Sequence, residues 1–337
     1  MMKRKRLWFF VTGLPVVGLL WAMKSAASWR PQVFGVQKDA ASLWLSGHDR
    51  LLVVSCFDGL NPFQVWDVAS RKSLWKARGG DYPLNVSPDE RVLAQAHAPY
   101  PIRGDLYQLK GVRFELHDAL DGHLLRVLKP PIAQPNFQHG EELLDAGFSP
   151  DGREFRLATT ARLLRWSVAS GRALVNRKWP ARNKGQALTS GEFLLNQEQL
   201  VAFDGTFVVF DARTGGLIRR LNTLHVAPDE SMGVAPDGFS FYELSDNTKS
   251  RIFRLSDGRE LWHSSNIPTF SARGELAFVA TSVGINVFDA HTGAKLRALP
   301  GPKVEKGWAP SLAPSGDGNW LLNTDSHSDK LLIWRAR

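Results

Sequence analysis

Residue types that could carry out chemistry are present in this 337-residue chain, but few stand at catalytic spacing. The nine histidines are dispersed, and none stands at metal-ligand spacing from another. Asp325, His327 and Asp329 share one short segment and could contact a cation, but a solvated loop is the favoured explanation of this cluster. The segment 73–76 has the SxxK spacing of a nucleophilic serine, yet its companion motifs are missing. We therefore assign no catalytic, metal-ligating or cofactor-binding residue from the sequence.

The motifs of common enzyme classes are absent from the sequence. The chain holds no Walker loop, no GxGxxG fingerprint, no GxSxG elbow and no HExxH metal site. Cys56 is the single cysteine, so an intramolecular disulfide and a CxxC zinc or redox site are both excluded. It falls in a β-prone apolar run, where we expect a small buried residue rather than a reactive thiol. These absences favour a binding protein over an enzyme.

Two proline-containing insertions, 98–111 and 129–142, offer side chains suited to recognising a partner. They combine aromatic with basic residues, a mixture suited to recognition, and binding residues are often found on surface loops. The candidate partner-binding residues are Tyr100, Arg103, Tyr107, Lys110, Phe137 and His139. The alternative is that both insertions are surface loops without a function.

A repeated unit with two turns must position these insertions. In its clearest copy, the segment Ser149-Pro150-Asp151-Gly152 predicts a tight turn, because proline presets φ, aspartate bonds the backbone and glycine accepts a positive φ. β-prone runs follow at 155–160 and 163–168, and Ser170-Gly171 predicts a second turn before another strand. No helix-period stripe interrupts them. The unit therefore predicts three or four short antiparallel strands.

Seven copies of this unit follow one another. An apolar, an aromatic and a polar residue end the third strand of each copy, with imperfect matches at His117 and Arg165. The central residues of the seven triplets are Trp66, His117, Trp166, Phe210, Phe253, Phe288 and Trp334. The second turn keeps register in the six copies where it can be checked, with Arg71 as the one departure from glycine. Spacings of 35 to 51 residues between triplets are typical of four-stranded propeller blades.

The repeats resemble those of seven-bladed propellers of the WD-repeat type and of the YVTN-like propellers of the bacterial envelope. Val65-Trp66-Asp67 is the literal WD signature, and the resemblance covers residues 31–337. The Gly-His dipeptide that opens a WD repeat stands instead in a first turn, as Gly47-His48, so we do not expect the buried polar network of that family. Trp75 and Trp262 also resemble the docking tryptophans of quinoprotein-like propellers. The resemblance implies an all-β, seven-bladed ring.

Closing such a ring requires a strand from the N-terminus. Seven third strands are present, but only six fourth strands follow them, so one blade edge would stay open. The segment 32–36 is the spare strand-like segment, and pairing it with 330–335 would close the ring; a dangling linker is the alternative.

Because strand direction alternates, the SPDG-type and Ser/Thr/Asp-Gly turns share one face, here called the first face. Both insertions fall on the opposite, second face.

The first 30 residues form a separate segment. Four basic residues at 3–6 precede an uncharged, largely apolar run at 7–23, which predicts a signal peptide or a signal anchor. As a helix this run would span about 25 Å, close to the short limit for a bilayer core of about 30 Å. The small residues at 25–27 offer a cleavage site, so cleavage and retention both stay open. Either outcome places residues 31–337 in the periplasm or another extracytoplasmic space, tethered to the membrane if the leader is retained.

The formal charge of +9 does not indicate a nucleic-acid-binding protein. Residues 1–30 hold six basic residues and no acid, so the remainder carries 36 basic against 33 acidic residues. That balance provides no electrostatic footprint for nucleic acid. The expected partner is therefore a protein or a peptide, with the membrane as a further contact through an uncleaved leader.

We predict a non-catalytic envelope propeller that acts as a protein- or peptide-binding scaffold. The resemblance leaves a second class open, a channel-centred propeller enzyme such as a lactonase-like hydrolase or a quinone-dependent dehydrogenase. Enzymes of that design collect their ligands from several blades, so local motifs would not reveal them. Three or more ionisable residues around a common void would favour the enzyme, and an axis lined by small or apolar groups would favour the scaffold.

Overall fold

The computed structural model describes the chain in segments, and all of the regular elements in them are strands. The segments are 32–36, 40–56, 63–97, 112–128, 141–180, 188, 190–194, 198–221, 232–244, 249–271, 273–300, 312–315, 319–325 and 330–335. In these segments there is no helix with the length and apolar character needed to cross a bilayer. The predicted leader and residues 98–111 and 129–140 of the two insertions lie outside the described residues.

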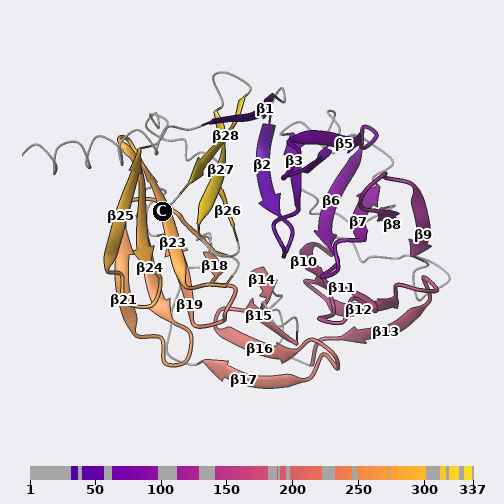
Figure 1. Ribbon diagram of the computed structural model, residues 1–337. Helices are drawn as coiled ribbons and strands as arrows, with labels where there is room; N and C mark the ends of the chain where they lie inside the picture. The colour runs from indigo at the N-terminus through magenta and orange to yellow at the C-terminus, as the bar shows by residue number, and fades with distance from the viewer. Residues whose placement is uncertain are drawn as a thin grey trace, which may run out of the picture.

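Within the described segments, twenty-eight strands form seven four-stranded antiparallel sheets, the blades of a ring (Figure 1). Blade 1 consists of β2 (Ala40–Leu45), β3 (Leu51–Cys56), β4 (Gln64–Asp67) and β5 (Lys72–Lys76); blade 2 of β6 (Asp81–Val86), β7 (Val92–His97), β8 (Arg113–Asp118) and β9 (Leu124–Leu128); blade 3 of β10 (Leu143–Phe148), β11 (Glu154–Thr159), β12 (Arg162–Ser167) and β13 (Ala173–Lys178). The predicted all-β, seven-bladed fold is confirmed.

The remaining blades repeat this order. Blade 4 consists of β14 (Ser190–Phe193), β15 (Gln199–Phe203), β16 (Phe207–Asp211) and β17 (Leu217–Leu221); blade 5 of β18 (Met232–Val234), β19 (Ser240–Leu244), β20 (Ser250–Arg254) and β21 (Glu260–Ser264); blade 6 of β22 (Pro268–Phe270), β23 (Leu276–Thr281), β24 (Gly284–Asp289) and β25 (Lys295–Pro300); blade 7 of β26 (Leu312–Pro314), β27 (Trp320–Asp325), β28 (Lys330–Arg335) and β1 (Gln32–Val36).

The first strand of each blade lies at the hub of the ring. β6, β10, β14 and β18 contact one another in turn, and β26 contacts both β22 and β2. The fourth strands lie at the outer rim, where β13 exposes most of its side chains to solvent. Antiparallel alternation then places the two kinds of turn on the first face and the connections between blades on the second face.

The core is divided into seven clusters of buried apolar side chains, one at each junction between neighbouring blades. The recurring aromatic residue of the third strand belongs to these junctions. Trp166 of blade 3, for example, packs on Phe114 of blade 2 with ring centroids 6.1 Å apart. Phe210 of blade 4 lies in the same cluster as Leu163 of blade 3. The aromatic repeat in the sequence is therefore the packing requirement of the junction.

Tryptophans from two fourth strands dock on the following blade. Trp75 donates a hydrogen bond from Nε1 to the carbonyl oxygen of Ala119 at 3.0 Å. Its ring covers the glycine of the next second turn, since a Cβ added to Gly122 would lie 2.6 Å from the indole. Trp262 repeats the contact with the carbonyl oxygen of Ala290 at 3.0 Å. The expected tryptophan docking is thus present at the junctions between blades 1 and 2 and between blades 5 and 6.

Arginine makes the equivalent contact at the next two junctions. Arg126 occupies on β9 the ladder position that Trp75 occupies on β5, and its Nε donates to the carbonyl oxygen of Ala169 at 3.1 Å. Arg177 of β13 donates from Nη1 to the carbonyl oxygen of Thr214 at 2.7 Å. A long side chain with a terminal N–H can therefore replace the indole in capping the carbonyl groups of the neighbouring turn.

A β-bulge interrupts the pairing of the third and fourth strands at the same position in blades 1 to 6. The extra residue in each bulge is leucine or isoleucine. These residues are Leu74, Leu125, Leu174, Ile218, Leu261 and Leu296. Because a bulge bends its strand and increases the local twist, this repeated residue marks where each outer strand turns toward the next blade.

Residues other than glycine keep the turn backbone in three of the turns, one of them at Asp49 with φ 60°. Arg71 has φ 58° and Glu90 has φ 56°, the left-handed conformation that glycine adopts in the other copies. Glu90 also reaches the first turn of blade 1, where its Oε1 accepts the hydroxyl of Ser46 and the N–H of His48, the latter at 3.0 Å. A contact between blades thus compensates for the strain at Glu90.

β1 forms the outermost strand of blade 7, so both ends of the described chain meet there (Figure 1). It pairs antiparallel with β28, from Gln32 opposite Ile333 onward. A Cβ added to Gly35 would lie 2.8 Å from the ring of Trp66 in blade 1. Arg71 donates from Nη2 to Oε1 of Gln32 at 3.0 Å. β1 therefore contacts blade 1 as well as blade 7.

Tryptophan docking predicts that Gly293→Ala will destabilise the fold more than Gly152→Ala. Both glycines have positive φ, 71° and 69°, so both variants carry the cost of about 1–2 kcal/mol for a left-handed alanine. Only the Cβ at position 293 would meet a docked ring, 2.4 Å from Cγ of Trp262, whereas position 152 has its nearest neighbour at 3.8 Å. We expect Gly293→Ala to cost roughly 2 kcal/mol more in urea unfolding. Equal costs would contradict this account of the docking.

Candidate functional site

Two carboxylates on neighbouring hub strands each bind the backbone of the next blade. Asp145 of β10 accepts the N–H of Ala146 at Oδ1, 2.8 Å, and the N–H of Phe193 at Oδ2, 2.6 Å. Phe193 belongs to β14, the hub strand of blade 4. Glu192, also on β14, accepts the N–H of Val234 in blade 5 at Oε2, 2.9 Å. The two side chains therefore link the hub strands of blades 3, 4 and 5.

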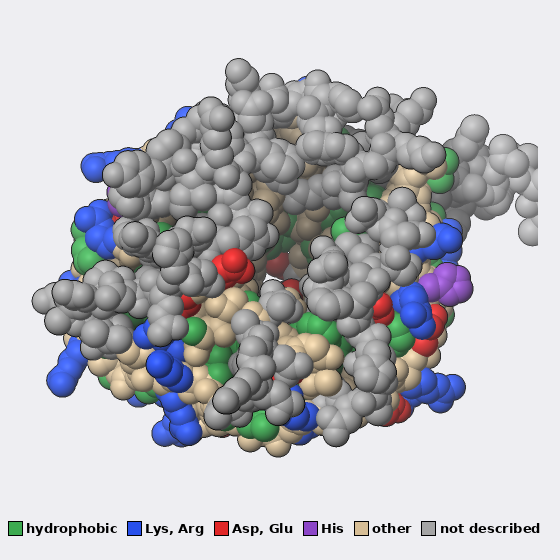
Figure 2. All heavy atoms as spheres, turned by 180° about the vertical axis from the view of Figure 1, so that it is seen from behind, with side chains coloured by type: hydrophobic (Ala, Val, Ile, Leu, Met, Phe, Trp, Pro, Cys, Tyr) green, Lys and Arg blue, Asp and Glu red, His purple; other side chains and the backbone are tan. Residues whose placement is uncertain are grey.

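Asn85 of β6 extends this series to blade 2 with a neutral side chain. Its Nδ2 donates to the carbonyl oxygen of Ala146 at 2.9 Å, and its Oδ1 accepts the N–H of Val86 at 2.8 Å. The centre of the ring is hollowed on the face seen in Figure 2, and acidic side chains lie around that hollow. We call Asn85, Asp145 and Glu192 the hub links.

Burial shifts the acidity of the two hub carboxyls toward neutral pH. Desolvation raises the pKa of Asp145 to about 6, outweighing the two amide hydrogen bonds. Desolvation, followed by the charge of Asp145, raises the pKa of Glu192 to about 7. Desolvation and then the charge of Glu192 raise the pKa of Tyr242 on β19 to about 12. No described lysine, arginine or histidine contributes to the pKa shift of either carboxyl.

The hub therefore holds three coupled ionisable groups, which is the arrangement that we associated with a channel-centred enzyme. A carboxyl with a pKa near 7 could exchange protons in general acid–base chemistry. Both carboxylates, however, already accept backbone N–H groups of a neighbouring blade, and this commits them to holding strands together. The geometry favours a structural and electrostatic role over catalysis.

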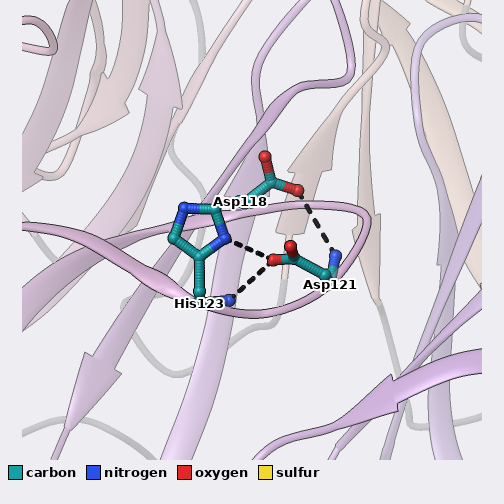
Figure 3. Close-up of side chains that lie close together, drawn as sticks. All are labelled: Asp118, Asp121 and His123. Carbon is teal, nitrogen blue, oxygen red and sulfur yellow. Dashed lines mark hydrogen bonds and ion pairs between the residues drawn. The ribbon is translucent and has the colours of Figure 1, made fainter.

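A second cluster lies in an exposed first-face turn between β8 and β9 (Figure 3). Asp118, Asp121 and His123 are the three described residues whose ligand atoms are close enough to share a metal ion. Oδ1 of Asp118 accepts the N–H of Leu120 at 2.8 Å. Oδ1 of Asp121 accepts the N–H of His123 at 3.0 Å and contacts its Nδ1 at 2.5 Å. These oxygen atoms already stabilise the turn.

The same turn recurs in other blades without a histidine at the position of His123. Asp67 accepts the N–H of Ser70 at 2.7 Å, and Asp289 accepts the N–H of Thr292 at 2.8 Å. Hydrogen bonds from Ser70 hold the pKa of Asp67 below its usual value, as those from Thr292 do for Asp289. Asp118 is thus the repeated acid of the second turn. Its cluster is explained by turn chemistry, and we assign no metal site to it.

Polar pairs with a buried carboxylate hold both ends of the first insertion. His97 ends β7, and its Nδ1 lies 2.6 Å from Oδ1 of the buried Asp81. Arg113 begins β8 on the far side of the insertion, and its Nη2 lies 2.6 Å from Oε1 of the buried Glu115. Glu115 also accepts a hydrogen bond from Nε2 of Gln95 at 3.3 Å. The strand ends on both sides of the first insertion are therefore each held by a pair with a buried carboxylate.

The second insertion ends on a buried ion pair. Arg162 donates to both oxygens of Glu141, from Nε at 2.9 Å and from Nη2 at 2.8 Å. The hydroxyl of Thr159 donates to the same carboxylate at 2.6 Å, and Trp179 donates to the carbonyl oxygen of Thr159 at 2.8 Å. Removing one partner of such a bidentate buried pair typically costs about 3–5 kcal/mol. This anchor, Glu141 with Arg162, gives the insertion a rigid base.

The structure tests few of the sequence-predicted site residues directly. All six candidate partner-binding residues lie outside the described residues, as do His327, Asp329 and the side chain of Asp325. Ser73 lies exposed on the outermost strand of blade 1, where its hydroxyl donates to Oε1 of Gln64 at 3.4 Å. Sequence reasoning missed the hub links. The signal was a single acid inside an otherwise apolar strand, as in Leu143–Phe148.

Comparison with known proteins identifies the fold alone. No family model matches the chain, and no curated protein matches it. Among solved structures, it is similar to the β-propeller domain of Cps50 (Swd1) from Myceliophteria thermophila, with a TM-score of 0.63 and 15% identity, over 91% of this chain and 100% of that one. In all, 1641 chains of known structure show significant similarity, so the fold is too widespread to select a function.

Proposed function

We propose that this propeller is a non-catalytic scaffold that binds a protein or peptide on its second face. The observation that carries the proposal is the pair of anchored insertion stems, in which buried carboxylates are paired and so hold the backbone beside each insertion in one geometry. Glu141 and Asp81, each 8% exposed or less, hold the ends of segments that carry aromatic and basic residues. Loops on rigid bases lose less entropy when they bind.

The first face is less suited than the second face to binding a partner. Its turns use their polar groups internally: the hydroxyl of Ser149 donates to Asp151 at 2.6 Å and accepts the N–H of Glu154 at 2.9 Å. The second turns use their aspartates in the same way, as at Asp289. Short turns of one repeated shape also provide little variation from which a specific surface could be built.

Replacing Tyr100, Tyr107 and Phe137 together with alanine should abolish partner binding. Buried aromatic anchors at interfaces typically contribute about 2 kcal/mol or more each. The partner is first identified by affinity capture with the wild-type chain and then purified for titration calorimetry. The control variant replaces the first-face residues Arg153, Phe239 and Arg273 with alanine. Loss of binding in the control but not in the insertion variant would reverse the assignment of faces.

We further propose that the chain is a WD-repeat-type propeller, close to the YVTN-like envelope propellers, and that β1 closes its ring. The repeated turn register and the Val65-Trp66-Asp67 signature support the first point. The pairing of β1 with β28 and its contact with Arg71 support the second. A strand supplied by the other end of the chain covers the edge of β28 that would otherwise be free to pair elsewhere.

Ring closure predicts a sharp difference between two truncations. A chain that begins at Gln32 keeps β1, whereas a chain that begins at Gln37 lacks it and exposes the edge of β28. We expect the longer chain to melt cooperatively as a monomer. The shorter chain should melt at lower temperature and self-associate, measured by scanning calorimetry and sedimentation velocity. Identical melting of the two chains would show that β1 is dispensable.

Export of residues 31–337 is also a proposal, based on the basic residues at 3–6 and the apolar run at 7–23. Whether the leader is cleaved or retained as a membrane anchor distinguishes a free from a tethered scaffold. A C-terminal reporter that is active only in the cytoplasm should stay inactive when fused to the full chain. Strong reporter activity would exclude export, and deletion of residues 1–30 is the positive control.

The hub carboxylates keep the channel-centred enzyme as a second candidate. Asp145 and Glu192 are coupled, and both have pKa values in the range of catalytic acids and bases. They lack a described nucleophile or cofactor-binding group in hydrogen-bonding contact, since their described bonds lead to backbone N–H groups. For this reason we place the scaffold first.

A further inference from the structure

Charge is distributed unevenly between the hub and the outer surface of the ring. The seven hub strands carry three acids, Asp81, Asp145 and Glu192, and no lysine or arginine. The six fourth strands that form the outside of blades 1 to 6 carry one acid, Glu260, against nine lysines and arginines. The near balance of charge over residues 31–337 therefore conceals a basic outer surface.

The positive charge is densest on β13 and β17, the outer strands of the adjacent blades 3 and 4. Arg177 and Lys178 lie on β13, Arg219 and Arg220 lie on β17, and all four side chains are exposed. Arg220 pairs with the buried Asp204 at 2.9 Å, and among the described residues it is the only one of the four with an ion pair. Lysine and arginine side chains project from the periphery of the ring in Figure 2. We call β13 and β17 with their exposed side chains the basic rim.

Exposed aliphatic side chains accompany these cations. The bulge residues Leu174 and Ile218 are 48% and 49% exposed, and Leu217 is 44% exposed. Charged residues on an edge strand prevent it from pairing with other chains, but this protection works with either sign of charge and needs no aliphatic neighbour. A single sign of charge mixed with exposed aliphatic groups therefore indicates a binding surface.

We propose that the basic rim binds the surface of an anionic lipid bilayer. Lysine and arginine are attracted to anionic headgroups, and aliphatic side chains enter the boundary between the headgroups and the acyl chains. β13 and β17 follow one another along the convex outside of the ring, which offers a flat surface access to both strands (Figure 1). This inference does not rest on the proposed scaffold function.

The side chains of the basic rim fit a bilayer better than a macromolecule. Neither β13 nor β17 contains an aromatic residue. Surfaces that bind single-stranded nucleic acid stack the bases on aromatic side chains, and duplexes are held mainly by phosphate contacts, in which aliphatic groups take no part. Protein interfaces are enriched in aromatic residues and depleted of lysine. Only the lipid surface uses both the cations and the aliphatic groups.

Contact through the basic rim would set the ring on its edge. The outer strands lie at the periphery, so a bilayer against β13 and β17 covers neither the first face nor the second face. The bases of both insertions would then remain accessible from the aqueous side. If the scaffold function holds, a partner could occupy the second face while the ring stays on the membrane.

Hydrogen exchange on the wild-type full chain tests the contact without any substitution. Exchange is compared on vesicles of phosphatidylcholine alone and on vesicles that also contain phosphatidylglycerol. We expect the amides of β13 and β17 to exchange more slowly on the anionic vesicles, because these strands form the contact. The internal control is β21, which carries Glu260 and no lysine or arginine. Equal protection of β21, or no protection of β13 and β17, would overturn the proposal.

Vesicle sedimentation measures the contribution of the charges. The double variant Lys178→Gln with Arg219→Gln should lower the partition coefficient on anionic vesicles about 25-fold at low salt, or about fivefold per charge. The control Arg91→Gln with Arg273→Gln removes two exposed charges from the first face and should change it little. Residues 1–30 are common to all of these chains, so the ratios report the rim. An equal loss in the control would show that only net charge matters and would refute the basic rim.

A third variant separates a bilayer from other anionic partners. Leu174→Ser with Ile218→Ser should weaken vesicle binding at least about fivefold, because both side chains leave the lipid boundary. Unchanged vesicle binding in this variant would mean a purely electrostatic contact and would overturn the bilayer assignment. Binding of a DNA duplex that requires Lys178 and Arg219, without binding to vesicles, would assign the rim to nucleic acid instead. Hydrogen exchange on the wild type decides the outcome even if a variant fails to fold.

Discussion

The fold depends on the junction between neighbouring blades. Each blade is a twisted four-stranded sheet with apolar side chains on both faces, so it is stable only when a neighbour covers each face. The division of the core into seven clusters, one at each junction, follows from this requirement. Among the described residues, every buried apolar cluster is shared by two blades. A chain of repeated sheets is therefore stable when the blades form a ring in which each blade packs against both of its neighbours.

Polar contacts between neighbouring blades occur at three positions in the ring, and different junctions use different ones. At the rim, Trp75 or an arginine such as Arg126 caps carbonyl groups of the next turn. On the first face, Glu90 joins two turns across a junction. At the hub, side chains of Asn85, Asp145 and Glu192 hold the next inner strand. Apolar packing supplies most of the stability and is non-directional, whereas these bonds set the angle and height at which the blades meet.

The hub carries its polar groups at an energetic cost. Apolar hub residues would avoid the desolvation that raises the pKa of Glu192 to about 7, and the neutral Asn85 shows that the link itself needs no charge.

The sequence by itself determined the blades, because turn chemistry is local: the Ser149–Gly152 turn, the triplet around Trp166 and the glycine at 171 all act within a few residues. It also indicated the docking of Trp75 and Trp262. Only the tertiary structure brought Asp145 within hydrogen-bonding distance of Phe193, 48 positions away, and placed it beside Glu192. Neither acid, considered within its own strand, indicates a contact with the next blade. They lie near each other only because consecutive blades pack their inner strands side by side, and no local pattern encodes that arrangement.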